Sequence, residues 1–395
     1  MSTNIQKNQI TEGIIWRQLL LFFFPILLGT FFQQLYNTID SVIVGQFVGK
    51  EALAAVGGSS AQIVAFVVGF FTGLSSGASV TIAQFFGAKD SRSANKGLHT
   101  AYAIAAFGGL ILTVSGIILT PFLLEMMNTP ADIVADSAVY LRIYFAGIIF
   151  VLIYNMGSAI LRATGDSKRP LYYLIVCCII NIVLDVLFVI VFHMGVMGVA
   201  VATLIAQAVS AVLVTLKLMR SEGILKLSVK QIRFHGSILK MQLKLGLPTG
   251  FEAILFSITN IAIQSAVNTF GTDTTAAWSA YGKLDAIFWM VSTAFGIAIT
   301  TFVGQNYGAG KMDRVRKSTR VCLLMDFIVS AVLVVFLIAA RFLLFRLFTN
   351  DSHVIEIGCD MLVLITPWYI VYVFIEVIAG ALRGVGNVVV PVAIT

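Results

Sequence analysis

Ten apolar segments, each long enough to cross a hydrocarbon layer of ~30 Å as a helix, follow one another along this 395-residue chain. They occupy about residues 17–48, 54–86, 98–123, 136–161, 171–192, 197–219, 244–270, 276–307, 319–348 and 354–382. An eleventh begins near Val388. Only 11% of the residues are charged, against roughly 25% in soluble domains. The pattern therefore predicts an all-α, polytopic membrane protein with about ten full spans and a partial eleventh.

The basic residues gather in alternate loops between these spans. Residues 87–97, 162–170, 220–243 and 308–318 are the loops richest in Lys and Arg. Because cytoplasmic loops are enriched in these residues, we expect the four loops and the N-terminus to be cytoplasmic, in an inner (cytoplasmic) membrane. We therefore interpret the net charge of +7 as a topology signal, and we expect no nucleic-acid partner.

Two sequence motifs recur at one offset. "ILRATGDSKRP" aligns with "ALRGVGNVVVP" through Arg162 and Arg383, and "QFFGA" aligns with "QNYGA" through Gln84 and Gln305, both 221 residues apart (383 − 162 and 305 − 84). Six spans separate the copies, so both have the same orientation in the membrane. This predicts a parallel repeat of two six-helix bundles, residues 1–220 and 244–395, joined by a basic cytoplasmic linker, residues 221–243. The second bundle is expected to be incomplete.

Polar side chains in the first span form one stripe. Gln33, Asn37 and Asp40 lie at i, i+4 and i+7 within "FFQQLYNTID", so they share a helix face. We expect this stripe to face the interior of the first bundle. Pro25, earlier in the same span, removes one backbone hydrogen bond and can kink the helix.

A second polar group lies in the fifth and sixth spans. Asn181 and Asp185 share a helix face at i, i+4, and Thr203 lies about two turns into the next span, with Gln207 one turn beyond. At 1.5 Å per residue, Asp40, Asp185 and Thr203 all fall in the outer half of one bundle. Two carboxylates, an amide and a hydroxyl suit a small cation or a proton. Asp40 could equally mark the outer end of its helix, and periodicity and depth do not separate these interpretations.

Further acidic residues occupy spans of the second half. They are Glu252, Asp285, Asp326 and Glu376, and the repeat aligns Glu376 with Asn155. Carboxylates within a membrane are costly and are therefore candidate functional groups. Pairing with Lys283 would explain Asp285 without transport, and we assign Asp326, which is close to a basic loop, to structure. Packing of two helices through a polar contact explains Glu376 and Asn155 as well as a cavity lining does.

The motifs "FFQQLYNTIDSVIVGQFVG", "QFFGAKD", "LRATGD", "GLPTGFE" and "FVGQNYGAGK" together resemble the multidrug and toxic compound extrusion (MATE) transporters. The resemblance covers nearly the whole chain and implies twelve helices in two bundles around a central cavity. It further implies an antiporter, not an enzyme, that exports cationic or amphipathic drugs in exchange for Na+ or H+. On the resemblance, the chain ends where the family's eleventh helix begins.

The resemblance also implies roles for single residues. Asp40, Asn181, Asp185 and Thr203 fall where the family's N-terminal bundle holds its cation and proton site, so a Na+ ion there is the one metal we expect. The substrate cavity is expected to include Gln33, Asn37, Asn155, Gln207, Glu252, Asp285 and Glu376. We expect no cofactor, a small-molecule substrate, the lipid bilayer as surroundings, and a monomer.

Three other functions compete with this one. A lipid-linked oligosaccharide flippase would be expected to line its cavity with cationic groups for pyrophosphate, whereas the charges within these spans are mostly acidic. An intramembrane enzyme is disfavoured because the chain contains no HExxH motif and no paired catalytic His–carboxylate spacing. The four cysteines form no CxxC pair, which disfavours a zinc site. A channel would not need an internal duplication, but the sequence does not separate it from a transporter.

Overall fold

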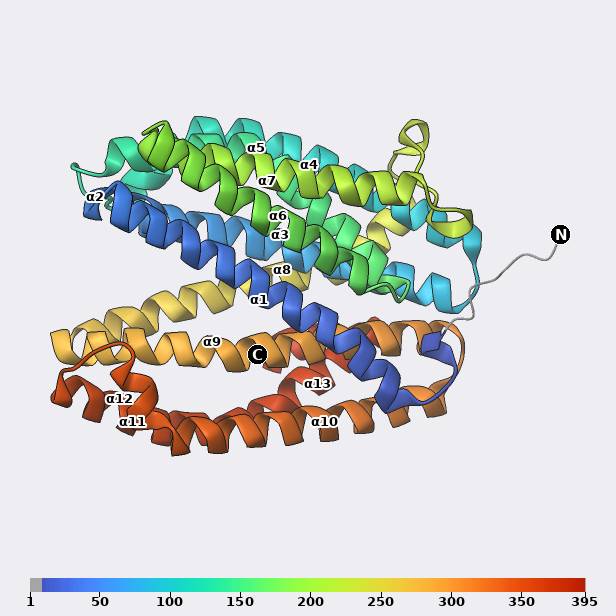
Figure 1. The fold of residues 1–395 in the computed structure, drawn as a ribbon. Helices are drawn as coiled ribbons and strands as arrows, with labels where there is room; N and C mark the ends of the chain where they lie inside the picture. The colour runs from blue at the N-terminus through green and yellow to red at the C-terminus, as the bar shows by residue number, and fades with distance from the viewer. Residues whose placement is uncertain (1–8, 395) are drawn as a thin grey trace. The chain divides into compact units, whose positions relative to one another are not determined.

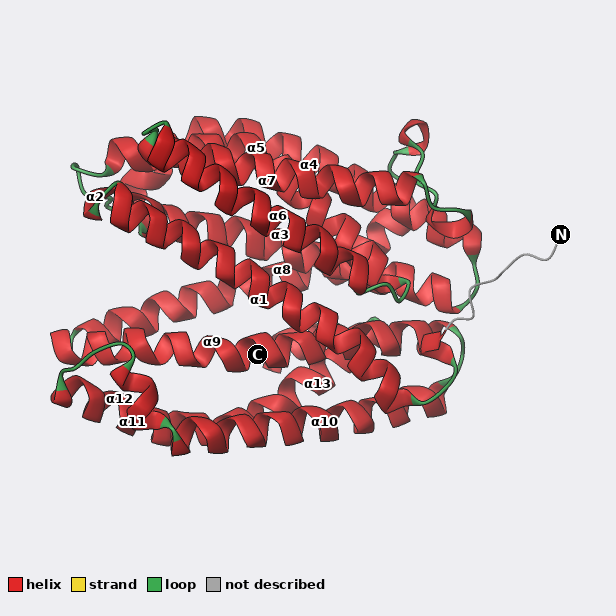
Figure 2. Cartoon of the chain, viewed as in Figure 1, coloured by secondary structure: helices red, strands yellow, loops and turns green. Residues whose placement is uncertain are grey.

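The computed structural model describes residues 9–394, and every regular element in that range is a helix (Figure 2). In chain order these are η1 Gln9–Thr11, α1 Ile15–Phe47, α2 Lys50–Gly57, α3 Ser59–Gly87, α4 Ser91–Met126, α5 Val134–Ala163, α6 Lys168–Asp185, η2 Val186–Val191, α7 Gly195–Met219, η3 Gly223–Leu225, η4 Val229–Gln231, α8 Gly236–Asn268, α9 Thr272–Gly308, α10 Met312–Ala339, α11 Arg341–Arg346, α12 Ser352–Ile365, η5 Thr366–Trp368, α13 Tyr369–Val385 and α14 Val389–Ile394 (Figure 1).

Ten of the described helical segments are long and apolar enough to cross a membrane. The predicted spans are therefore confirmed in number and type. The two largest differences in the bounds are at the start of the seventh span and at the end of the ninth. The seventh span, expected from residue 244, begins at Gly236, because Lys240 and Lys244 lie on an exposed face of α8 and not in a loop. The ninth, expected to reach residue 348, ends at Ala339 and is followed by the short helix α11.

The chain divides into two compact units. One is Leu28–Ala253, and the other combines Met1–Leu27 with Ile254–Thr395. Helices α1 and α8 are each shared between the units, since the first part of α1 packs with helices of the second half and the first part of α8 with helices of the first half. The predicted domains 1–220, 221–243 and 244–395 describe the sequence repeat and remain a prediction.

The helix bounds repeat at the offset found in the sequence. Helix α8 begins and ends 221 residues after α1 (236 − 15 and 268 − 47), and α3 and α9 end at Gly87 and Gly308. The same offset relates the first residues of α4 and α10, Ser91 and Met312. Because local sequence sets where a helix ends, helix bounds that recur at one offset support an internal duplication.

The repeated LRxxG motif is a helix C-cap in both copies. The backbone N–H of Gly165 donates to the carbonyl of Arg162 at 2.9 Å, and that of Gly386 donates to Arg383 at 2.9 Å. The two glycines have φ of 96° and 93°, in the left-handed region where a side chain is disfavoured. The motif therefore recurs because both copies end a helix with one backbone geometry.

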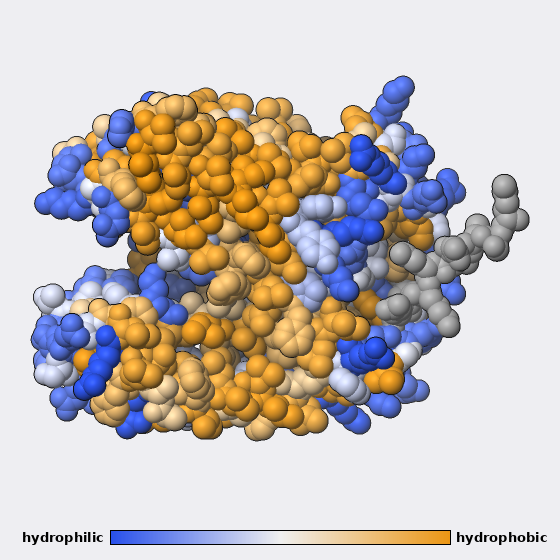
Figure 3. Space-filling model, viewed as in Figure 1, coloured by the Kyte–Doolittle hydropathy of each residue, from blue (hydrophilic) through white to orange (hydrophobic). Residues whose placement is uncertain are grey.

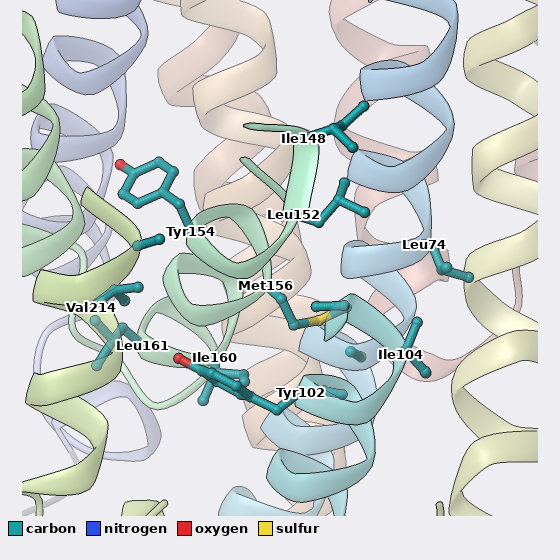
Figure 4. Close-up of a cluster of buried hydrophobic side chains, with 14 of the residues drawn as sticks. Leu74, Tyr102, Ile104, Ile148, Leu152, Tyr154, Met156, Ile160, Leu161 and Val214 are labelled. Atoms are coloured by element: carbon teal, nitrogen blue, oxygen red, sulfur yellow. The ribbon is translucent and has the colours of Figure 1, made fainter. Parts of the chain in front are cut away.

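The core of the Leu28–Ala253 unit lies between α3, α4, α5 and α7. Met156 and Ile160 of α5, Tyr102 of α4 and Val214 of α7 belong to one buried cluster (Figure 4). A Cβ added at Gly157 would come within 2.8 Å of Val214. The absence of a side chain at this position therefore lets α5 and α7 approach closely. Small residues at contacts between helices are typical of membrane bundles.

The core of the other unit is rich in phenylalanine. Phe22 and Phe23, near the start of α1, pack against α9, with the rings of Phe23 and Phe295 stacked 4.1 Å apart and those of Phe22 and Phe302 edge-to-face at 6.1 Å. These contacts hold the first part of α1 in this unit.

On the face shown in Figure 3, the surface is apolar along the middle of the helices and hydrophilic toward their ends. Large exposed apolar side chains include Phe122 of α4 and Val335 of α10. This distribution fits helices that face lipid over most of their length.

Candidate functional site

Two buried carboxylic acids lie beside each other in the Leu28–Ala253 unit. Asp40 comes from the second half of α1 and Asp185 is the last residue of α6, and their carboxyl groups are close enough to interact directly. Asp185 is fully buried and Asp40 nearly so. Two carboxylates at this separation repel each other strongly unless a proton or a cation lies between them.

Asn181 and Thr203 complete this polar cluster. Asn181 lies one turn before Asp185 on α6 and donates its amide to Oγ1 of Thr203 on α7 at 3.5 Å, while the Thr203 hydroxyl also lies beside the carboxyl of Asp40. The structure thus brings together the four residues Asp40, Asn181, Asp185 and Thr203. We call them the carboxylate cluster.

Several oxygen atoms in the carboxylate cluster have no hydrogen-bond donor among the described residues. They are Oδ1 of Asp40, Oδ1 of Asn181 and both carboxylate oxygens of Asp185, all buried. A buried polar atom without a partner normally costs about 1–3 kcal/mol. Oxygen atoms of this kind are hard ligands, so the arrangement can take a small cation or hold a proton between the carboxylates.

The backbone changes its helical form next to Asp185. The five-turn helix α6 ends there, and residues Val186–Val191 continue as the π-helix η2. A π-helical turn inserts extra backbone into a helix and is frequent at functional sites. The sequence carries no evident sign of it, because "VLFVIV" fits an ordinary apolar span.

Tyrosines line the cluster, and the sequence analysis missed them. Tyr36 of α1 accepts a hydrogen bond from Nε2 of Gln207 at 3.3 Å. Tyr140 of α5 lies near both Asp40 and Asp185 and stacks on Tyr144 at 6.2 Å. Tyr36 could have been found, because it precedes Asp40 by four residues on the same face of the helix. Tyr140 could not, since its local sequence, between Asp136 and Arg142, does not indicate which helices it meets.

The polar stripe on α1 only partly faces the bundle interior. Asp40 is buried, but Gln33 and Asn37 are exposed. The expectation that the whole stripe faces inward was therefore wrong. The buried face of this part of α1 passes through Tyr36 and Asp40, and a helix of 3.6 residues per turn carries Asn37 about 100° away from Tyr36.

In the second unit, Asp285 accepts hydrogen bonds from three aromatic residues. Trp289 donates from Nε1 at 2.8 Å, and the hydroxyls of Tyr281 and Tyr369 also donate to the carboxylate. Lys283, the partner that the sequence suggested as one alternative, has an exposed side chain. An aromatic frame, not an ion pair with Lys283, therefore holds Asp285.

Glu376 of α13 belongs to a neighbouring network of the same unit. It accepts from Nη2 of Arg383 at 2.9 Å and from the hydroxyl of Tyr372 at 3.2 Å. A Cβ at Gly296 would lie only 2.0 Å from the Glu376 carboxylate, so α9 leaves room for it. Asp326 is fully buried and accepts from the hydroxyl of Ser330 at 3.1 Å.

The remaining predicted cavity residues lie in the Leu28–Ala253 unit. Glu252 of α8 is buried, and Asn155 of α5 is half-buried. Gln207 belongs to the surroundings of the carboxylate cluster through its bond to Tyr36. Two groups thus emerge, the carboxylate cluster in one unit and the acidic–aromatic residues around Asp285 and Glu376 in the other.

The fold defines an all-α, polytopic membrane protein with an internal duplication and buried acidic groups inside its spans. The chain belongs to the MatE family, whose model matches residues 25–187 and 248–395. It is therefore a membrane transporter of this family. The two matched stretches fall in the two copies of the repeat.

Relatives and solved structures agree with this assignment. The probable multidrug resistance protein YoeA of Bacillus subtilis (strain 168) is 30% identical over 389 residues, which is 96% of this chain and 84% of that protein. The probable multidrug resistance protein NorM of Thermotoga maritima is 28% identical over 403 residues, 99% of this chain and 84% of its own. A solved structure described as the outward-facing conformation of a multidrug resistance MATE family transporter shares the fold. Its TM-score is 0.91 at 22% identity, and the match covers 99% of this chain and 87% of that one.

Proposed function

We propose that this protein is a secondary active antiporter that exports cationic or amphipathic compounds in exchange for Na+ or H+. The observation that carries this proposal is the pair of buried carboxyl groups, Asp40 and Asp185. Three of their oxygen atoms and Oδ1 of Asn181 are buried and lack a donor among the described residues.

Coupling at the carboxylate cluster follows from charge. With both carboxylates ionised, repulsion favours any conformation that separates α1 from α6 or admits water. A proton or Na+ between them removes that repulsion and favours close packing. An ion that binds one conformation more tightly than the other shifts the equilibrium between them, and exchange results if the drug has the opposite preference.

Binding of a cationic substrate is supported by the acidic and aromatic side chains. Asp285 lies against Trp289, Tyr281 and Tyr369, and Glu376 lies against Tyr372. Aromatic faces and carboxylates together attract organic cations. We assign the exposed amides of Gln33 and Asn37 to substrate binding as well, together with Asn155, Gln207 and Glu252 of the Leu28–Ala253 unit.

The proposal includes a location and an orientation. The protein lies in an inner (cytoplasmic) membrane as a monomer, with residues 87–97, 162–170, 220–243 and 308–318 in the cytoplasm. Single cysteines at residues 168 and 314, in a variant lacking the native cysteines, should react with an impermeant maleimide only after intact cells are opened. Strong labelling in intact cells would contradict this orientation.

The transport test uses proteoliposomes that contain the purified protein. An imposed Na+ or H+ gradient should drive saturable movement of a fluorescent cationic dye, and one of the two ions should suffice. Movement that does not saturate would indicate a channel. Transport of a lipid-linked oligosaccharide without dye transport would favour the flippase.

A further inference from the structure

The first turns of α8 present two faces of different character. Ile238, Gln242 and Gly246 lie on the buried face. That face is pressed against α3, because a Cβ at Gly77 would meet backbone atoms of Gln242 and Gly246 at 2.4 Å. Lys240 and Lys244, one turn apart, lie on the exposed face. The buried face therefore fixes the position of α8, and the exposed face that carries the two lysines is free to bind something else.

A shallow groove of about 520 Å³ runs along this exposed face. Its apolar lining comes from Leu239, Leu243, Leu247 and Pro248, and its charged lining from Lys240 and Lys244. The apolar surface continues beyond the groove at Phe251, which is 55% exposed. The two positive charges thus stand at one end of an apolar strip that follows the helix.

The length of α8 puts these lysines at the level of the lipid headgroups. The helix has 33 residues and is therefore roughly 50 Å long, about 20 Å longer than a hydrocarbon core of ~30 Å. Lys240 and Lys244 lie roughly 6 Å and 12 Å from its first residue. Lysines at this depth extend toward the headgroups while their methylene groups stay in apolar surroundings.

The internal repeat shows that the fold does not require these charges. The 221-residue offset aligns Lys240 with Leu19 and Lys244 with Phe23 of α1 (240 − 19 and 244 − 23). Both residues of α1 are buried, at 0% and 3% exposure. The copy of this helix in the first half therefore uses the two positions for packing, whereas α8 exposes a positive pair.

From these observations we infer that the groove on α8 binds an anionic phospholipid. The phosphate accepts hydrogen bonds from Lys240 and Lys244 and is attracted by their positive charges. An acyl chain of the same lipid lies over Leu243 and Leu247. A phosphate at the membrane surface is attracted by each nearby lysine, and the apolar strip below the lysines requires a chain and not a free anion.

The test measures how lipids associate with the purified protein, so it is independent of transport. Spin-labelled phosphatidylglycerol and phosphatidylcholine are compared by electron paramagnetic resonance in vesicles of phosphatidylcholine. The unmodified protein should prefer phosphatidylglycerol. Lys240→Gln with Lys244→Gln should reduce that preference about five-fold or more. Lys240→Arg with Lys244→Arg should retain it.

A matched control removes two other exposed charges. Arg316→Gln with Lys317→Gln on α10 makes the same change in net charge and should leave the preference within two-fold of the unmodified protein. Equal preference in the Lys240/Lys244 variant and the unmodified protein would overturn the inference. So would displacement of the labelled lipid by millimolar glycerol phosphate, because that would show a site for a soluble anion.

Discussion

The carboxyl group of Asp40 on α1 lies beside that of Asp185 on α6, and both are buried among tyrosines and apolar residues. Residues 145 apart in sequence are thus brought into one cluster (185 − 40). Since two such groups do not both keep a charge there cheaply, the protonation or ion occupancy of this pair is tied to the packing of α1.

Thr203→Val should weaken binding of the coupling ion while the protein stays folded. The substitution keeps the shape but removes the hydroxyl beside Asp40, which also accepts from Asn181 at 3.5 Å. Loss of one such contact costs about 1 kcal/mol, or roughly five-fold in affinity. The readout is the Na+ or H+ concentration that gives half-maximal dye transport.

Thr215→Val is the matched control for that prediction. Thr215 is also on α7, but its hydroxyl pairs with Tyr102 at 3.3 Å. It should leave the half-maximal ion concentration unchanged. An equal shift in both variants would mean that the effect comes from packing of α7 and not from the carboxylate cluster.

Gly77→Ala should destabilise the contact of α3 with α8. Its Cβ would come within 2.4 Å of backbone atoms, which no side-chain movement can relieve. We expect a loss of about 1–3 kcal/mol, measured as a lower midpoint of thermal unfolding in detergent. Gly57→Ala, where nothing lies within 4 Å, should be neutral or slightly stabilising. A smaller loss at Gly77 than at Gly57 would contradict the packing described for α3 and α8.

The two copies of the repeat also predict a pair of opposite effects on stability. Lys89 has φ of 58°, and the equivalent position in the second copy is Gly310, with φ of 71°. A side chain is disfavoured in this left-handed region by roughly 1 kcal/mol. Lys89→Gly should therefore raise the midpoint of thermal unfolding, and Gly310→Lys should lower it. Changes of the same sign at both positions would be inconsistent with a shared helix cap.

The loop before α8 should be held more weakly in acid. Burial, with the nearby positive charges of Arg233 and Lys96, lowers the pKa of His235 below its ordinary value. The loop in its folded position therefore favours the neutral form of the His235 ring. The contribution of His235 to the stability of the folded loop is complete above the ordinary pKa of about 6.5. It is lost as the pH falls through the lower pKa that His235 has in the folded loop.

Hydrogen exchange can follow this change at one backbone group. The N–H of His235 donates to Oγ1 of Thr100 at 3.3 Å, and its protection, corrected for the intrinsic pH dependence of exchange, should decrease between pH 7.5 and pH 5. His235→Gln should remove that dependence on pH. Constant protection over this range in the unmodified protein would contradict the assignment to His235.

The spans and the repeat could be predicted because their causes are local. Each span contains a long apolar window, and the motifs around Arg162 and Arg383 recur because both end a helix with a left-handed glycine. The start of α8 was missed for an equally local reason. Lys240 and Lys244 interrupt the apolar pattern, although one exposed face of the helix accommodates both.

The surroundings of the carboxylate cluster were less predictable because they depend on contacts between distant helices. Asp40, Asn181, Asp185 and Thr203 could be proposed from depth and periodicity. The π-helix η2 could not, since it lies in uniformly apolar sequence, and neither could the approach of Tyr140, since its local sequence does not show which helices it meets. Gln33 and Asn37 were wrongly expected inside the bundle, because spacing defines a shared helix face but not its rotation toward a neighbour.

Gradient-driven dye transport by Asp40→Asn tests the central claim most directly. Asparagine keeps the shape of the side chain and removes the charge that makes the carboxylate cluster responsive to Na+ or H+. The variant should fold normally, with an unfolding midpoint no lower than that of the unmodified protein, and should lose coupled transport. Asp326→Asn, which alters a buried carboxylate bonded to Ser330 in the other unit, should retain most of it. A folded Asp40→Asn protein with normal transport under the same ion gradient would contradict the assignment of coupling to Asp40 and Asp185.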